Sequence, residues 1–223
     1  SVLDALTNNS DQELGPARER LAWILGRDVE RLNETGILRA AAETASENAV
    51  DGIFAPFFWM AIGLLVWTVF PAGPGPLSLA WVFKASSTID SMLGYKHGRL
   101  RWLGSAGARL DDALTWLPCR LVMLTLPLVS CTCREWSNLV IAAERDGASD
   151  PSPNAGRSIA IYAHCAKVRL GGGNWYAQGW VDKPILGAKH PVIDKNGVRR
   201  ILKLSFRLQC LWLTAFVLVK LTQ

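Results

Sequence analysis

The feature that most restricts the fold of this chain is an uncharged apolar run. Residues 53–70 contain eighteen consecutive positions without Asp, Glu, Lys or Arg. A helix that crosses the hydrocarbon core of a bilayer needs about twenty apolar residues. The run ends at PAGPGP (71–76) and apolar residues resume at 77–83. This pattern predicts a helical hairpin, or a broken helix that returns to its starting side.

Two further segments indicate a polytopic membrane protein. Residues 113–133 are apolar apart from Arg120, and residues 205–220 contain a run short enough for either a short span or an interfacial helix. Half of the residues are hydrophobic and ten are Trp, a combination rare in soluble domains. We predict an all-α, polytopic membrane helical bundle, with residues 1–223 as one domain and with polar loops and amphipathic helices on one face. The apolar membrane segments are expected at 53–83, 113–133 and 205–220.

The sequence also predicts amphipathic helices and a final helix that includes the third apolar segment. Helical spacing of apolar residues favours helices at 13–32, 37–50, 136–145, 158–168 and 198–220. Residues 146–156 predict a loop, and residues 174–191 an irregular segment. The five cysteines show no CxxC spacing, which favours reduced, buried thiols over a metal site or a disulfide framework.

The charge pattern restricts the partners. The net charge is +5, but Lys and Arg alternate with acidic and apolar residues rather than forming a basic block. A nucleic-acid binder usually concentrates its basic residues, so we expect no nucleic acid partner. The surplus of positive charge is typical of proteins that bind phosphate ligands or that have basic cytoplasmic loops at a membrane. We therefore expect a multi-pass protein of the cell membrane, with its active face cytoplasmic and the lipid bilayer as a partner.

A dense polar segment, residues 84–112, lies between two apolar runs. Such a position favours a site for anionic or metal-bound ligands. Its candidate residues are Lys84, Ser86, Ser87, Asp90, Tyr95, Lys96, Arg109, Asp111 and Asp112. Plainer alternatives remain: Asp111 and Asp112 could cap a helix that starts at Ala113, and the lysines could mark only a membrane boundary.

Three other clusters carry polar groups. Glu43, Glu47 and Asp51 are spaced four apart, so on a helix they share one face and repel unless a cation neutralises them; the alternative is a solvated acidic stripe. Residues 152–156 (SPNAG) predict a tight turn in which Asn154 caps the following helix. Residues 169–176 (RLGGGNWY) lack the Walker pattern, but their glycines can form an anion nest of backbone N–H groups.

Together these clusters resemble the CbiB/CobD family of adenosylcobinamide-phosphate synthases, integral membrane proteins of cobalamin biosynthesis. The matching stretches are residues 26–59, 84–96, 108–121, 152–156 and 168–176, and KASSTIDSMLGYK at 84–96 is highly specific. Family members carry further apolar helices at the N-terminus. The resemblance therefore implies that this chain lacks the N-terminal membrane helices of its family.

The resemblance also implies an activity. A propionate carboxylate of adenosylcobyric acid would be joined to the amine of an amino-alcohol phosphate, such as 1-amino-2-propanol O-phosphate, with ATP and Mg²⁺ as cofactors and the corrinoid as substrate. ATP would convert the carboxylate to an acyl phosphate, and phosphoryl transfer relies mainly on positioning and charge stabilisation. Other enzymes of the corrinoid pathway or a second copy of the chain are further expected partners.

We assign hypothetical roles on this basis. Hard carboxylate oxygens suit Mg²⁺, and basic side chains suit phosphate oxygens. We expect catalytic roles for Asp90, Asp111, Asp112 and Lys84, and Mg²⁺ binding by Asp111, Asp112 and Glu47. We expect substrate or ATP contacts from Glu43, Glu47, Asn48, Asp51, Ser86, Ser87, Tyr95, Lys96, Arg109, Asn154, Arg169, Gly171, Gly172 and Tyr176.

Two other classes of function remain open. A membrane transporter or sensor would use the same charges for ligand passage, and a non-catalytic scaffold would assist enzymes of the corrinoid pathway. Charges embedded in mid-helix would favour transport, whereas charges in loops and at helix ends favour an enzyme. A single site also requires all three polar regions to meet on one membrane face, with a chain reversal near residues 130–134.

Overall fold

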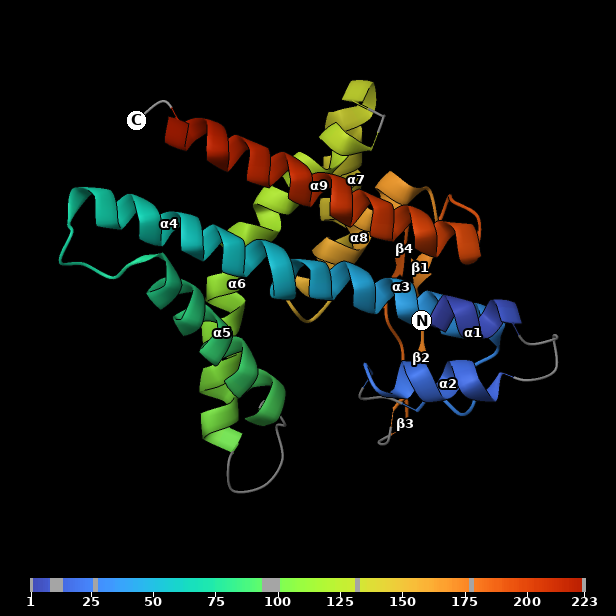
Figure 1. Cartoon of the computed structure of the whole chain (residues 1–223). Helices are drawn as coiled ribbons and strands as arrows, with labels where there is room; N and C mark the ends of the chain where they lie inside the picture. Colours follow the sequence, from blue (N-terminus) through green and yellow to red (C-terminus); the bar gives the residue numbers. More distant parts are fainter. Residues whose placement is uncertain are drawn as a thin grey trace.

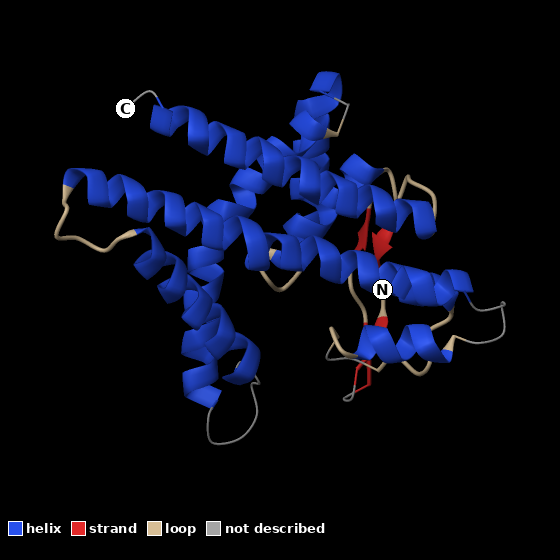
Figure 2. Ribbon diagram, in the orientation of Figure 1, coloured by secondary structure: helices blue, strands red, loops and turns tan. Residues whose placement is uncertain are grey.

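The computed structural model describes residues 2–8, 14–25, 28–93, 101–130, 133–176 and 179–221. Figure 1 shows the order of the elements, and Figure 2 shows that helices dominate the chain. The helices are α1 (Val2–Asn8), α2 (Gly15–Ala22), α3 (Glu34–Ala49), the π-helical η1 (Val50–Phe54), α4 (Ala55–Val69), α5 (Pro76–Leu93), α6 (Arg101–Val129), the 3₁₀-helical η2 (Cys133–Glu135), α7 (Trp136–Gly147), α8 (Ala155–Ala166) and α9 (Lys195–Leu221). The predicted all-α class of membrane helical bundle is confirmed.

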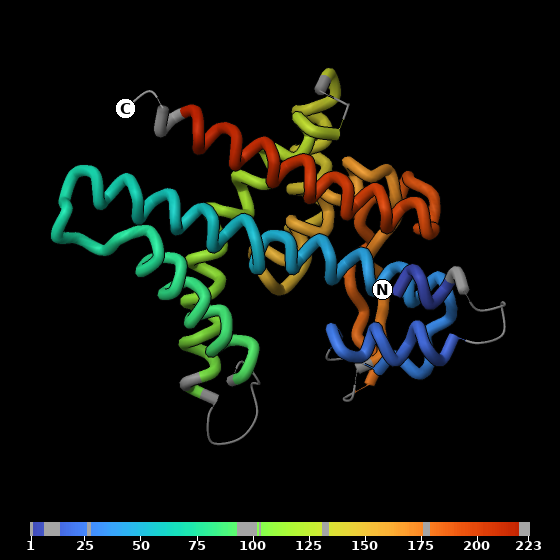
Figure 3. The backbone as a smooth tube through the Cα atoms, in the orientation of Figure 1, coloured from blue at the N-terminus to red at the C-terminus, as the bar shows by residue number. Residues whose placement is uncertain are grey.

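Within the described residues, three stretches are long and apolar enough to cross a membrane: Glu34–Val69, Gly104–Val129 and Lys195–Leu218. They overlap the three predicted apolar segments but have different bounds. The first joins α3, η1 and α4 into one continuous rod, as Figure 3 shows, and α5 is not among the candidates. Helix α9 packs against α3 and extends to the same side of the molecule as α4.

The segment 71–76 reverses the chain, which confirms the predicted hairpin. Helices α4 and α5 pack along each other, and α5 in turn packs on α6. The turn lies so close to α4 that a Cβ atom at Gly63 would be 2.7 Å from Cα of Pro76. This hairpin brings the polar residues of α5 and α6 beside α3 and η1.

A π-helical turn links α3 to α4. In η1, Val50 and Phe54 are buried and Asp51 is partly exposed. A π turn holds one more residue than an α turn, and such turns occur often at functional sites. Here the wide turn carries one of the predicted site residues.

Helix α7 returns along α6, with Nε1 of Trp136 donating to the Leu124 carbonyl at 2.7 Å, which agrees with the predicted reversal between them, and α8 packs on both helices. Two short antiparallel pairs follow: β1 (Leu170–Gly171) with β4 (Ile185–Leu186), and β2 (Asn174–Tyr176) with β3 (Gly179–Val181). The prediction of an irregular segment at 174–191 was therefore wrong for β2, β3 and β4, whereas residues 182–184 and 187–191 have neither helix nor strand. The buried core includes Ile37, Phe54, Leu126, Ile161, Tyr162 and Ile201.

Three other local predictions need correction. The helix predicted at 13–32 ends at Ala22, because Arg18 donates two hydrogen bonds to the carbonyl of Leu32, at 2.8 and 3.0 Å, and folds the chain back. Helix α3 begins earlier than predicted, since Oδ1 of Asn33 caps it by accepting the N–H of Gly36 at 2.8 Å. Buried free thiols are confirmed for Cys119 and Cys165, whereas Cys210 is exposed.

A glycine contact between α7 and α8 gives a first prediction. A Cβ atom at Gly147 would lie 2.6 Å from both N and Cα of Arg157, so backbone would have to move. We expect Gly147→Ala to lower the free energy of unfolding by about 1–3 kcal/mol, as overpacking does. Gly15→Ala is the matched control, because no atom lies within 4 Å of its added Cβ. Thermal unfolding of both variants checks this, and equal stability of the two would contradict it.

The α7–α8 pair also predicts a pH dependence. His164 is buried, and its Nε2 lies 2.9 Å from Oδ2 of Asp146; burial outweighs this carboxylate and lowers the pKa of His164. Burial and the charges of His164, Lys189 and Lys167 likewise lower the pKa of His190. The unfolded chain then binds protons that the folded chain does not, so stability falls as the pH drops below about 6.5.

Unfolding measured between pH 7 and pH 5 tests this expectation. A double variant, His164→Gln with His190→Gln, is expected to show a flatter pH profile than the parent chain over that range. Burial raises the pKa of Asp146, but hydrogen bonds from the Gly187 N–H and from His164 outweigh it and lower the pKa overall. The stability that the ionised Asp146 carboxylate contributes is therefore lost only at a lower pH than the stability linked to the histidines. An unchanged slope in the double variant would contradict the assignment to these histidines.

Candidate functional site

All of the predicted acidic residues except Glu43 line one cavity of about 340 Å³, here called the acidic cavity. It lies between α3 with η1, α5, α6 and the turn that precedes α8. Its carboxylates come from Glu47, Asp51, Asp90, Asp111 and Asp112, and its other polar lining from Thr115, Ser152, Asn154 and Ser158. The SPNAG turn and the tandem aspartates therefore lie together, as the condition of a single membrane face requires.

A hydrogen-bond network fixes Asp112 at this cavity. Nδ2 of Asn154 donates to the backbone carbonyl of Asp112 at 2.8 Å and to its Oδ1 at 3.4 Å. The hydroxyl of Ser152 donates to Oδ1 of Asp112 at 3.2 Å. Asn154 is only 6% exposed. Its side chain thus holds Asp112 in place rather than waiting free for a ligand.

The predicted capping role of Asn154 was wrong. Its side chain makes no cap hydrogen bond to α8. The hydroxyl of Ser152 instead accepts the N–H groups of Asn154 and Ala155, both at 3.2 Å. Capping by Ser152 leaves the amide of Asn154 available to reach α6.

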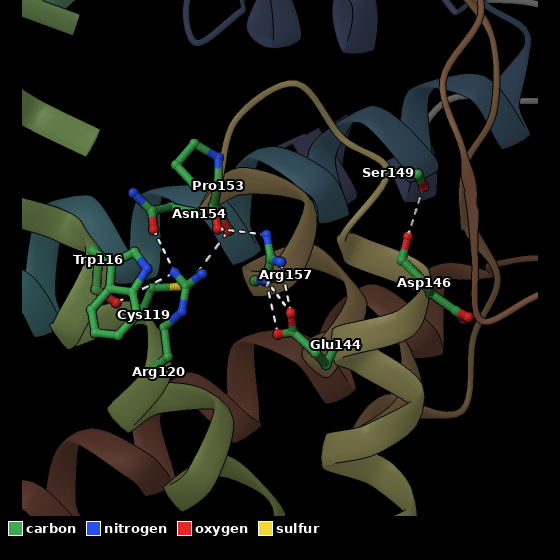
Figure 4. Close-up of polar contacts among 9 residues, drawn as sticks. All are labelled: Trp116, Cys119, Arg120, Glu144, Asp146, Ser149, Pro153, Asn154 and Arg157. Carbon is green, nitrogen blue, oxygen red and sulfur yellow. Dashed lines mark hydrogen bonds and ion pairs between the residues drawn. The ribbon is translucent and has the colours of Figure 1, made fainter. Parts of the chain in front are cut away.

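Arg120 completes the network and was not among the predicted site residues. Figure 4 shows its Nη1 donating to Oδ1 of Asn154, at 2.7 Å, while its guanidinium lies 4.7 Å from the centre of the Trp116 ring. Behind it, Arg157 donates to the Pro153 carbonyl at 2.9 Å and pairs with Glu144 at 2.6 Å. The sequence did contain a signal for Arg120, because it is the one charged residue in an apolar run. A charged side chain within a membrane segment costs free energy and often has a function.

The acidic cavity carries strong negative charge. None of its described lining residues is a Lys or Arg. Lys84 is exposed, and its charge acts on Asp51 and Asp111 from outside the lining. Burial and the charge of Asp112 raise the pKa of Asp90. Such crowding of like charges favours a bound cation or cationic group.

The carboxylate oxygens of the acidic cavity fit a Mg²⁺ ion whose other ligands are water and the phosphate oxygens of a bound substrate. Oδ1 of Asp111 is buried and has no hydrogen-bond partner among the residues described. Across the same part of the chain, no three His, Cys, Asp or Glu side chains are arranged to hold a metal by themselves. Mg²⁺ typically uses one or two carboxylates and completes its shell with water and phosphate oxygens. Asp111, Asp112 and Glu47 thus stay predictions for that ion.

A second cavity, of about 820 Å³, lies at the other end of α3 and is here called the basic cavity. Its lining includes Arg31, Arg39 and Arg169 together with Trp175 and Trp180. The described lining contains no Asp or Glu. Charge is therefore segregated between the two cavities.

Glu43 and Arg39 hold residues 169–174, here called the glycine loop, against α3. Oε1 of Glu43, which is buried, accepts the N–H of Gly171 at 2.9 Å. Arg39 donates to the carbonyls of Gly171 and Gly173 at 3.0 and 3.1 Å, and to Oδ1 of Asn174 at 2.9 Å. Glu43 therefore anchors the loop, a contact that its predicted role in ligand binding did not foresee.

The prediction of an anion nest in the glycine loop was wrong. The N–H of Gly171 is taken by Glu43, and that of Gly172 donates to the Pro184 carbonyl at 3.1 Å. Glycine at position 171 is required for another reason: its φ is 74°, and a Cβ atom would collide with the Pro184 oxygen. The loop shapes the wall of the basic cavity and leaves anion binding to side chains.

Of the other candidate residues, those with described side chains line neither cavity. Asn48 and Arg109 are exposed and line neither one. Ser86 is buried and its Oγ has no partner among the residues described, while Ser87 is partly buried. Tyr95 and Lys96 lie outside the described residues. Tyr176 belongs to β2, but its side chain is not among those described.

The fold and the site together define a helical membrane protein with a carboxylate-lined cavity between helices that include candidate spans. The model of the CobD/CbiB protein family matches residues 1–205. The chain belongs to this family.

Individual relatives agree with this assignment. The chain is 46% identical over 176 residues to the cobalamin biosynthesis protein CobD of Synechocystis, an alignment that covers 78% of this chain and 49% of the relative. It is 37% identical over 209 residues to the cobalamin biosynthesis protein CbiB of Salmonella paratyphi A, covering 93% and 61% of the two chains. The chain thus spans about half to three-fifths of these relatives. No solved structure matches it.

Proposed function

We propose that the protein acts in cobalamin biosynthesis as an acid–amine ligase. In this proposal ATP drives the joining of adenosylcobyric acid to an amino-alcohol phosphate, which gives adenosylcobinamide phosphate. The names of the relatives and membership of the CobD/CbiB family support the pathway. The observation that carries the chemistry is the convergence of Glu47, Asp51, Asp90, Asp111 and Asp112 in one cavity.

The reaction places two demands on that cavity. A carboxylate oxygen of the corrinoid attacks the terminal phosphoryl group of ATP, releasing ADP, and the amine nitrogen then attacks the acyl carbon and displaces phosphate. Bound Mg²⁺ would neutralise charge on the phosphoryl oxygens. The ammonium group must lose a proton before it attacks.

The residues divide between these demands. Asp111, Asp112 and Glu47 are the proposed Mg²⁺ ligands, of which the ion would use one or two at a time and complete its shell with water and phosphate oxygens. Asp90 is the proposed proton acceptor, because burial and the charge of Asp112 raise its pKa and make it a stronger base. The cavity would also attract the ammonium group of the amino-alcohol phosphate, and Lys84 would compensate the charge of its phosphate.

Transport or sensing is the second candidate, and one structural observation favours it. From the sequence, the charges are expected in loops and at helix ends, a location that favours an enzyme. The structure instead places Asp51, Asp111 and Asp112 within helices of candidate spans, and Asp90 within α5. The alternative of an N-terminal cap at Ala113 was also wrong, since α6 begins at Arg101. The preference for an enzyme therefore rests on membership of the CobD/CbiB family.

Product analysis separates the candidates. The chain is reconstituted in lipid with ATP, Mg²⁺, adenosylcobyric acid and 1-amino-2-propanol O-phosphate. We expect ADP release that requires both organic substrates, and a new amide detected by mass spectrometry. Transport predicts no amide, and a scaffold predicts no turnover by the isolated protein. ADP release without amide, or no turnover in a full-length relative carrying the same residues, would refute the ligase.

A further inference from the structure

We propose that the basic cavity is a nucleoside-phosphate site, separate from the carboxylates of the acidic cavity. The inference deepens the proposed function, because it rests on the use of ATP and assigns the nucleotide to named residues. Its support comes from three features of the cavity: free cationic groups, exposed indole rings and size.

Two guanidinium groups are available to an anion. Nη1 and Nη2 of Arg39 donate to the glycine loop, whereas the Arg169 side chain is exposed and pairs with no described residue. The Arg31 side chain is 65% exposed and forms a long ion pair, of 3.6 Å, with Asp28. Asp28 and Glu43 lie beside two of the arginines, but no carboxylate is among the described lining, so the lining itself is positive and attracts a phosphate.

Two exposed indole rings line the cavity and offer ring surface for stacking. Trp175 and Trp180 face each other across the β2–β3 pair, with ring centres 5.6 Å apart and planes at 68°. They are 41% and 55% exposed, and the guanidinium of Arg31 lies 5.0 Å from the Trp175 ring. Exposed aromatic rings beside arginines are the arrangement on which nucleobases stack.

The size and position of the cavity fit the same ligand. Its volume of about 820 Å³ lies within the usual range for small-molecule sites. Arg39 of the basic cavity and Glu47 of the acidic cavity are eight residues apart on α3, which is about 12 Å along the axis. Phosphates of a nucleotide in the basic cavity can therefore extend toward the carboxylates.

Binding without metal tests the proposal. The protein in nanodiscs, in the presence of a metal chelator, is titrated by calorimetry with ATP, inorganic triphosphate or adenosine. We expect ATP to bind more tightly than either of the other two, because only ATP offers both the ring and the phosphates. Equal binding of ATP and inorganic triphosphate would overturn the assignment to a nucleoside phosphate.

Variants locate the site. We expect Arg169→Gln to weaken ATP binding about tenfold and Trp175→Ala at least about fivefold, while Trp175→Phe retains most of the affinity. Arg199→Gln is the matched control, since Arg199 is exposed on α9 and bonds Asn196 rather than lining the cavity. Thermal unfolding confirms that each variant is folded, and any unfolded one is replaced by Arg31→Gln.

The outcomes separate this inference from the proposed ligase. Unchanged ATP affinity in folded Arg169→Gln and Trp175→Ala variants would overturn the site, even if the protein forms the amide. ATP binding that depends on these residues, in a protein that forms no amide, would leave the site standing and refute the ligase.

Discussion

Replacing Asp111 and Asp112 together by Asn is expected to abolish ATP-dependent amide formation, with a loss of at least about a thousandfold in kcat. Asn keeps the size of Asp but removes two negative charges from the acidic cavity. Oδ1 of Asp111 is buried without a hydrogen-bond partner among the described residues, so its charge is available to a cation. The loss should come from the site and not from unfolding, because removing like charges relieves repulsion.

A carboxylate outside both cavities provides the control for this double variant. Asp182→Asn removes an exposed carboxylate that lines neither cavity and should leave the rate unchanged. Rates are measured by amide product over a range of Mg²⁺ concentrations, and folding by thermal unfolding. Retained turnover in the double variant, with the Mg²⁺ dependence of the parent, would exclude both aspartates as metal ligands.

Replacing Arg120 by Met is expected to lower kcat about 10- to 100-fold, by an effect transmitted through Asn154. The change leaves Oδ1 of Asn154 buried without its donor, which costs about 1–3 kcal/mol and frees the amide to turn away from Asp112. Arg120 contacts Asn154 and Trp116 and does not line the acidic cavity, so it acts as a positioning residue. We therefore expect kcat to fall more than KM rises.

A double-mutant cycle distinguishes this relay from a general loss of stability. If Arg120 acts through Asn154, combining Arg120→Met with Asn154→Ala should cost little more than Asn154→Ala alone. Arg199→Met, on the exposed surface of α9, provides the matched change of residue type. Fully additive losses in the cycle would contradict the relay, as would an unchanged kcat in a folded Arg120→Met variant.

Apolar patterning and chain breakers were enough to predict the membrane helices and the hairpin. Few structures other than a helical hairpin are compatible with eighteen uncharged residues at 53–70 followed by the PAGPGP break. The backbone polar groups of a segment in the bilayer must form their hydrogen bonds within helices. The spacing of Glu47 and Asp51 placed both carboxylates on one helix face, and the acidic cavity confirms that they meet Asp111 and Asp112.

Contacts between distant residues could not be predicted in the same way. Gly98, Gly104 and Gly107 break the pattern before residue 112, yet α6 starts at Arg101 because packing on α5 outweighs weak helix propensity. The contact of Glu43 with Gly171 joins residues 128 positions apart, and no local pattern encodes such a pairing. The basic cavity was missed for that reason, since Arg31 precedes α3 and Arg39 lies within it, and no local pattern relates either residue to the glycine loop or to Trp175.

The wide turn at Val50–Phe54 has a consequence for how insertions act in this protein. Because the π turn holds one residue more than an α turn, α4 beyond it keeps the rotation that an uninterrupted α-helix one residue shorter would have. Converting Val50–Phe54 to α geometry without removing a residue would instead rotate everything beyond it by about 100° about the rod axis, and the apolar faces of α4 would point away from α5. The wide turn therefore accommodates one surplus residue while the lipid-facing and ligand-facing surfaces of the continuous helix stay in phase.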